Sequence, residues 1–165
     1  MVRFKNRWLL VEFIALSPET VSQAPSLSLA PTTTSLDAKQ IHSALRQSVI
    51  SHFGDAGWGK VGSSLMVKYF SPTTNLCIVR VARDAHTLVW GAVTLLTVIG
   101  GTRVIPHIVH VSGTIKHVQL AAMRYNREVV ARFRAGSKTA AQYHAQDSYE
   151  AYLEKSTREL EALQE

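Results

Sequence analysis

The sequence predicts an α/β (α+β) protein: a ferredoxin-like β-α-β-β-α-β sandwich followed by an additional C-terminal helix. Two observations predict this plan. Strand-like apolar runs and segments with an apolar residue every three or four positions follow one another in that order along the chain. The last predicted strand contains Pro106, which favours an edge position, and the ferredoxin-like plan places its fourth strand at an edge.

The first predicted strand is the apolar run at 8–16, which has the composition of a mostly buried strand. Residues 17–35 are rich in Pro, Ser and Thr and show no apolar period, so we expect a loop or disordered insertion without chemistry. Ser35 is a candidate cap for a first helix, which three glycines between positions 54 and 59 are expected to end. Its apolar positions recur every four residues: Ile41, Leu45, Val49 and Phe53.

Two strand-like segments at 64–70 and 76–82 are predicted to form a hairpin, because the SPTTN sequence between them is typical of turns. Asp84 is a candidate cap for a second helix that we expect to run to about Ile99, before Gly100 and Gly101. The fourth strand is predicted at 103–111. The side chains of the second helix expected to face the sheet are Leu88, Ala92, Leu95, Leu96 and Ile99.

A long helix predicted at 115–134 has two different faces when it is projected at about 100° per residue. A stripe of mostly apolar side chains is expected to face the core: Ile115, Val118, Ala122, Tyr125, Val129 and Phe133. Cationic side chains gather in a narrow arc roughly opposite: Lys116, Arg124, Arg127 and Arg134. Such a face is either simply solvated or binds an acidic partner.

The charge is unevenly distributed along the chain. Residues 61–136 hold nine Lys and Arg against two Asp and Glu, whereas residues 137–165 hold three against six. We therefore expect one ferredoxin-like domain at 1–136, with its insertion at 17–35, and an acidic, helix-prone C-terminal tail at 137–165. A basic body with an acidic tail is typical of proteins that bind polyanions, and nucleic acid fits better than a membrane.

Two apolar stretches raise the question of membrane targeting. The run after the basic N-terminus is interrupted by Glu12 and lacks a convincing cleavage site, so it does not fit a secretory signal. Residues 85–102 lack Asp, Glu, Lys and Arg but hold His86, several threonines and three glycines, and fit a buried helix better than a membrane span. We expect a soluble protein.

The sequence offers little for catalysis or for binding a metal ion. The single cysteine, Cys77, lies in a strand-like run and is expected to be a reduced intracellular thiol without a nucleophilic role. His107 and His110 are three apart in a strand and point to opposite faces, so a zinc site is not expected. No phosphate-binding glycine loop and no paired carboxylates are present. We therefore expect no catalytic residue, no metal site and no cofactor on the protein itself.

A basic ferredoxin-like fold is also the plan of RNA-recognition-motif (RRM) domains, so the predicted sandwich is RRM-like. The third strand, at 76–82, lacks the exposed aromatic residues that stack on RNA bases in those domains. If this protein binds RNA, it is expected to use its helices, its N-terminus and its loops.

Several motifs together resemble one family. Four motifs follow one another along the chain. They are VRFKNRWLL at 2–10, LVW in the second helix at 88–90, and GTIK at 113–116 and RYNR at 124–127 around the long helix. They are similar to the Pop-five subunits of eukaryotic ribonuclease P and ribonuclease MRP. The resemblance runs from residue 2 to about 134, interrupted at 17–35, and it does not cover the acidic tail. Ser112 stands where these relatives often have a second glycine.

This resemblance implies a non-catalytic subunit of a ribozyme. In that family the RNA, with Mg²⁺ at its active site, removes the 5′ leader from precursor tRNA, and the MRP relative processes precursor rRNA. The partners implied are the ribonuclease P and MRP RNAs, a TIM-barrel-like protein subunit and the other subunits of the complex. Precursor tRNA would be contacted only indirectly, no membrane partner is implied, and the implied location is the nucleus and nucleolus.

Site residues follow from the same resemblance. Arg3, Lys5 and Arg7 would lie against the catalytic RNA with Phe4 nearby, and Asn126 would offer a hydrogen bond. The residues expected to contact phosphates include Lys116, Arg124 and Arg127, and Arg134 lies on the same face. The alternatives are a frayed N-terminus and a structural role for Asn126 and Tyr125. The alternative function is a basic protein–protein adaptor within another ribonucleoprotein.

Overall fold

The computed structural model describes residues 5–16, 36–136 and 143–163. Its strands are β1 (Asn6–Ala15), β2 (Met66–Ser71), β3 (Leu76–Ala82), β4 (Val98–Ile99) and β5 (Thr102–Ser112). Its helices are α1 (Ala38–Val61), the 3-10 turn η1 (Arg83–Ala85), α2 (His86–Thr94), α3 (Ile115–Gly136) and α4 (Tyr143–Glu161). The predicted mixed α/β class, with a ferredoxin-like sheet and additional C-terminal helix, is confirmed.

The sheet is antiparallel with strand order β2-β3-β1-β5-β4. β1 lies at its centre, with Leu9 opposite Val79 of β3 and Val111 of β5. Pro106 pairs with Phe13 on its inner side, whereas β4 pairs only with Thr102 and Arg103. Pro106 therefore lies at an edge within the described part of the sheet, as its missing N–H requires.

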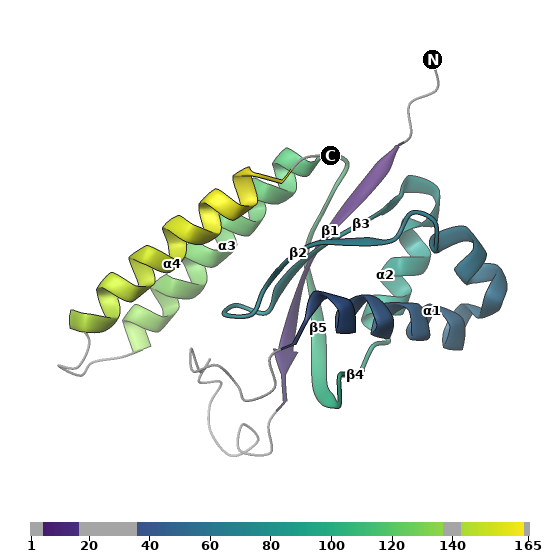
Figure 1. The fold of residues 1–165 in the computed structure, drawn as a ribbon, viewed down its shortest axis with the longest axis horizontal. Coiled ribbons are helices and arrows are strands. Elements are labelled where there is room, and N and C mark those ends of the chain that lie inside the picture. Colours follow the sequence, from purple (N-terminus) through teal and green to yellow (C-terminus); the bar gives the residue numbers. More distant parts are fainter. Residues whose placement is uncertain (1–4, 17–35, 137–142, 164–165) are drawn as a thin grey trace.

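Helices cover both faces of this sheet (Figure 1). α1 and α2 pack on the face that carries Leu9, Val11 and Phe13 of β1. α3 and α4 pack on the face that carries Trp8 and Leu10. All five of these side chains have no exposed surface, so β1 is a strand buried on both sides.

α1 consists of two helical segments that meet at Gly54, where the backbone is not helical, so the predicted end of the first segment at Gly54 is confirmed. Gly57 and Gly59 do not end a helix, because the second segment continues through them to Val61. Gly54 has a φ of +66°, which glycine adopts at little cost. Gly54 therefore ends the first helical segment, and a second, shorter segment begins directly after it. The helix start is marked by Asp37, whose N–H donates to Gln40 Oε1 at 3.3 Å; Ser35 lies outside the described residues.

The second helix is shorter than predicted and ends at Thr94. Val98 and Ile99 form β4 and pair with Arg103 and Thr102. Gly100 and Gly101, both with positive φ, form the two-residue hairpin loop between β4 and β5. The glycine pair thus makes a strand turn, and Leu95, expected to face the sheet, is 49% exposed.

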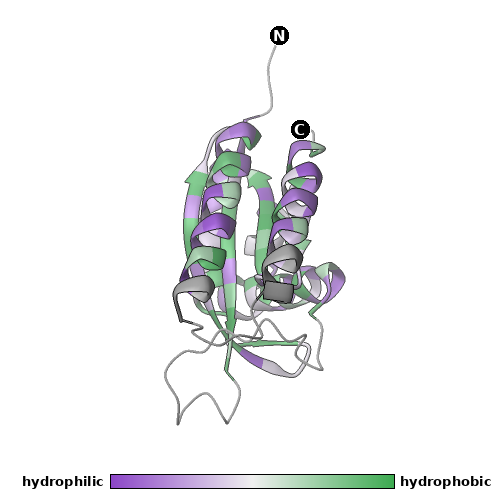
Figure 2. Ribbon diagram, turned by 90° about the vertical axis from the view of Figure 1, so that its left-hand side faces the viewer, coloured by the Kyte–Doolittle hydropathy of each residue, from purple (hydrophilic) through white to green (hydrophobic). Residues whose placement is uncertain are grey.

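The C-terminal segment contains α4, which lies along α3 over the sheet (Figures 1 and 2). Leu160 of α4 is fully buried in the same cluster as Ile115 and Val118 of α3. Gln119 Nε2 donates to the carbonyl oxygens of Leu160 at 2.6 Å and Leu163 at 2.9 Å. α4 therefore contributes to the core on this face of the sheet. None of the described helices combines the length and apolar character needed to cross a membrane.

Leu160→Ala tests whether α4 is part of the cooperative fold. We expect the free energy of unfolding to fall by about 2–5 kcal/mol, because the truncation removes buried methyl groups and leaves a cavity. Urea unfolding measures this change. Leu120→Ala on α3 is the matched control, since Leu120 is 61% exposed, and its effect should stay within about 0.5 kcal/mol. Equal midpoints for the two variants would show that α4 does not dock in solution.

Cys77 gives a second test of the core. Its thiol has no exposed surface, and burial raises its pKa well above the ordinary value, which disfavours the reactive thiolate. We expect a thiol reagent added at neutral pH to leave the native protein unlabelled and to label it fully in denaturant. Since the chain has one cysteine, the absorbance of the released chromophore reports this site alone. Rapid labelling without denaturant would contradict the burial of β3.

Candidate nucleic-acid interface

The exposed face of α3 carries Lys116, Arg124 and Arg127, which we call the α3 basic face. The predicted apolar stripe lies opposite, with Ile115, Val118, Ala122 and Val129 buried and Tyr125 half-buried. Phe133 and Arg134 belong to α3, but the surroundings of their side chains lie outside what the structure describes. The two-faced helix inferred from the sequence is therefore confirmed for the positions that can be compared.

The cations of the α3 basic face have no hydrogen bond or ion pair with any described residue. Neighbouring cations differ in this respect. Arg132 Nη2 lies 2.6 Å from Glu128 Oε1 on α3. On α4, Arg158 lies 3.6 Å from Glu154, and Lys155 lies 3.9 Å from Glu159. Glu154 and Glu159 of α4 therefore pair within their own helix, and the α3 basic face is available for an external anion.

Asn126 is not on that face. Its side chain is 1% exposed between α3 and α4, where Nδ2 donates to Ser156 Oγ at 2.8 Å. Ser156 Oγ also lies 3.1 Å from the Tyr69 hydroxyl. No described residue donates to Asn126 Oδ1. A direct RNA contact from Asn126 does not fit this burial, and the structural role weighed as the alternative does.

Tyr125 also has a structural environment. Burial raises the pKa of its phenol, and a hydrogen bond with Glu12 raises it further. Glu12 is 7% exposed on β1, and its Oε2 accepts a hydrogen bond from His107 Nδ1 at 3.3 Å. Tyr125 therefore joins α3 to the sheet, as expected from its place on the apolar stripe.

Of the N-terminal candidates, Lys5 and Arg7 lie at one end of the sheet. Arg3 and Phe4 fall outside the described residues, whereas Lys5 is exposed and Arg7 is half-buried at the start of β1. The pairing of Trp8 with Ser112 places this end beside the turn that leads into α3. A Cβ added to Gly113 would lie 3.1 Å from Arg7 Nη1, so the absence of a side chain there makes room for the guanidinium. The start of β1 and the start of α3, predicted as separate sites, are therefore neighbours.

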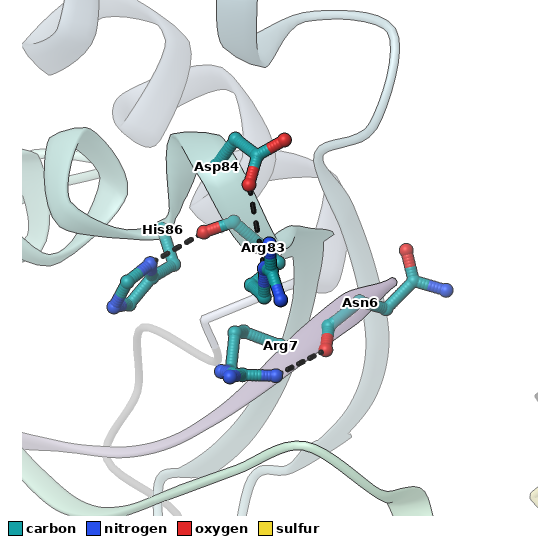
Figure 3. Close-up of polar contacts among 5 residues, drawn as sticks. All are labelled: Asn6, Arg7, Arg83, Asp84 and His86. Carbon is teal, nitrogen blue, oxygen red and sulfur yellow. Dashed lines mark hydrogen bonds and ion pairs between the residues drawn. The ribbon is translucent and has the colours of Figure 1, made fainter. Parts of the chain in front are cut away.

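Three further cationic or titratable residues join this end: Arg80, Arg83 and His86. Arg83 N–H donates to the carbonyl oxygen of Lys5 at 2.8 Å. His86 Nδ1 donates to the carbonyl oxygen of Arg83 at 2.6 Å, and Arg83 Nε lies 3.4 Å from Asp84 Oδ1 (Figure 3). With its amide oxygen turned toward β3, Asn6 accepts from Arg80 Nη2 at 3.2 Å and from Nε at 3.3 Å.

We call Lys5, Arg7, Arg80, Arg83 and His86 the end cluster. Sequence reasoning missed its members from β3, η1 and α2. These members could have been found from the antiparallel pairing of the two central strands, because this pairing brings the end of β3 to the start of β1. Both basic surfaces suit phosphate groups, which Lys and Arg bind through charge-assisted hydrogen bonds. Among the described residues, no group of three His, Cys, Asp or Glu side chains could hold a metal ion.

Comparisons with known proteins agree on one family. A sequence model described as the Rpp14/Pop5 family matches residues 7–123, from β1 into α3. Ribonuclease P/MRP protein subunit POP5 of Schizosaccharomyces pombe is 41% identical over 79% of this chain and 91% of its own length. The subunit of the same name from Homo sapiens is 30% identical over 77% of this chain and 73% of its own length.

A chain of the cryo-EM structure of yeast ribonuclease MRP aligns with a TM-score of 0.48 at 8% sequence identity. That alignment covers 80% of this chain and 98% of the other, and the family assignment does not depend on it. The match to the family model and the identity to the curated relatives, both spanning most of the chain, carry the assignment. The chain belongs to the Rpp14/Pop5 family.

Proposed function

We propose that this chain is a non-catalytic RNA-binding subunit of a ribonuclease P/MRP ribonucleoprotein. The observation that carries the RNA-binding part is the α3 basic face, whose three cations have no partner in the described part of the protein. Family membership supports the assignment to this complex, since the relatives are named as its subunits.

The fold supports a particular way of binding. Because helices cover both faces of β1 and β3, RNA bases cannot stack on these central strands as they do in an ordinary RRM domain. Cations on α3 and in the end cluster are available instead. Binding phosphates there would neutralise repulsion where RNA strands approach one another, and would thereby hold the folded RNA in shape.

In this proposal the RNA carries the cleavage chemistry, with Mg²⁺ at its active site. The complex would remove 5′ leaders from precursor tRNA and process precursor rRNA in the nucleus and nucleolus, with a TIM-barrel-like protein among its partners. The protein's own contribution is positioning. Its described side chains combine free cations with carboxylates that are paired or dispersed, an arrangement that suits binding better than acid–base catalysis.

A second candidate, an adaptor between proteins, is favoured by an apolar area at the other end of the sheet. Ile14 and Ile105 pair across β1 and β5 and are 45% and 50% exposed, and Val98 of β4 is 46% exposed. Exposed apolar patches of this kind are typical of protein interfaces. A protein subunit at this end is compatible with RNA at the end cluster, so the two candidates differ in what the basic surfaces bind.

Replacing Arg124 and Arg127 by alanine tests the α3 basic face. We expect weaker binding to the ribonuclease P RNA of the same organism, and a plot of log affinity against log salt shallower by roughly 1.4–1.8 for two lost phosphate contacts. The thermal midpoint should stay unchanged, since both side chains are exposed. Filter binding over a salt series measures the effect.

The matched control is Arg132→Ala with Arg158→Ala, which removes the same charge from arginines that are already ion-paired. It should weaken binding much less. Equal losses of RNA affinity in the two double variants would show that the effect depends on net charge alone. Wild-type binding by the Arg124 and Arg127 variant at every salt concentration, together with a protein partner that survives ribonuclease treatment, would favour the adaptor.

Asn126→Ala is expected to lower the stability of the protein without weakening its binding to RNA. Removing the donor to Ser156 should lower the free energy of unfolding by about 1–3 kcal/mol, because buried polar groups lose their partner. The RNA affinity of the folded protein should stay within about twofold, well under the tenfold that 1.4 kcal/mol represents. Urea unfolding and filter binding measure the two quantities. Lost RNA affinity with unchanged stability would instead restore Asn126 as an RNA contact.

A further inference from the structure

Trp90 is an exposed aromatic residue that the proposed RNA contacts do not use. Its side chain is 44% exposed on α2, whereas Trp8 is fully buried. The half-buried Trp58 is covered by Arg46, whose guanidinium carbon lies 5.3 Å from the ring centroid. The Trp90 ring has no aromatic or cation–π contact with any described residue. A large flat apolar surface is therefore open to a ligand.

Helix geometry places Trp90 beside the end cluster. Residues four apart lie on the same face, so His86 and Trp90 are neighbours separated by about 6 Å of rise. The core-facing residues of α2 are Val89, Ala92 and Val93. Gly91 faces α1, since an added Cβ there would lie 3.0 Å from Phe53 Cζ. The face with His86 and Trp90 thus differs from both the core side and the α1 side.

Cations lie at the N-terminal end of the same face. His86 Nδ1 donates to the Arg83 carbonyl oxygen at 2.6 Å, so this nitrogen carries the proton and Nε2 is left for a ligand. The Arg83 backbone is bonded to Lys5, and Arg7 lies at the adjoining start of β1 (Figure 3). Asp84 is the acidic group here; its side chain is 92% exposed and pairs with Arg83 at 3.4 Å.

We propose that Arg7, Arg83, His86 and Trp90 form a strip that binds a single-stranded segment of RNA. Trp90 would stack on an unpaired base, while the cations and the His86 Nε2 atom bind the adjoining sugar-phosphate backbone. A cationic track beside an exposed aromatic ring is the combination that binds single strands with little sequence preference. This inference rests on the proposed function and adds the type of RNA element to it.

The strip lies on the α2 side of the sheet, whereas the α3 basic face lies on the other side. The end cluster at the start of β1 connects them. One chain would therefore contact phosphates of folded RNA through α3 and an unpaired segment through α2. The two contacts are separable by mutation.

The test measures binding of the full-length chain to short oligoadenylate and to an abasic strand with the same number of phosphates. Trp90→Ala should weaken oligoadenylate binding roughly 5–150-fold, the range that corresponds to stacking of one base. Binding to the abasic strand should not change. Trp90→Phe should retain most of the affinity, because it keeps an aromatic ring, and its thermal midpoint controls for folding.

Leu95→Ala is the matched control, since Leu95 lies directly after α2 and is similarly exposed without an aromatic ring. It should bind both probes as the wild type does. Arg7→Gln with Arg83→Gln should weaken both probes, and Asp84→Asn should strengthen both, because it removes the carboxylate that competes for Arg83.

Unchanged oligoadenylate binding by Trp90→Ala would overturn the proposal, and so would equal losses on both probes. Loss of a protein subunit from the complex with intact oligoadenylate binding would instead assign Trp90 to a protein interface. If the Arg124 and Arg127 variant no longer binds ribonuclease P RNA while the Trp90 variants bind oligoadenylate normally, only the proposed single-strand site is contradicted. If that arginine variant also binds normally, the RNA-binding role itself is wrong.

Discussion

The burial of β1 on both sides is the constraint on which the rest of the structure depends. Leu9, Val11 and Phe13 pack against α1 and α2, and Trp8 and Leu10 pack against α3 and α4. A central strand with two apolar faces needs a helical layer on each side, because either face would otherwise expose a continuous hydrophobic surface. Contact with a large polar partner is therefore moved to the outer helix surfaces and to the ends of the strands.

α3 shows how this constraint divides one helix between several tasks. One side packs on the sheet through Ile115, Val118 and Ala122. A second side meets α4, where Gln119 and Asn126 donate hydrogen bonds to α4 and are almost fully buried. Among the described side chains of α3, the unpaired cations lie on the remaining side. Residues adjacent in the RYNR sequence thus have different roles, because each step of about 100° turns the side chain toward another environment.

The balance of charge also depends on where each partner lies. Glu154 and Glu159 of α4 pair with Arg158 and Lys155 one turn away, and the exposure of these side chains makes each pair worth only about 0.3–0.5 kcal/mol. Such pairs matter here mainly because each carboxylate is neutralised by a cation of its own helix. The α3 basic face keeps its positive potential beside an acidic helix. The end cluster gains Arg80, Arg83 and His86 from one stretch of chain that lies far from β1 in the sequence.

The sequence by itself determined the order of the main strands and helices, the edge position of Pro106 and the two faces of α3. Each depends on local periodicity or on the chemistry of one residue. Only the tertiary structure decided that a second helical segment follows Gly54, that Val98 and Ile99 form a strand, and that α4 buries Asn126. It also placed Arg80, Arg83 and His86 beside the start of β1. These features depend on contacts between segments far apart in the chain, whose energies no local pattern contains.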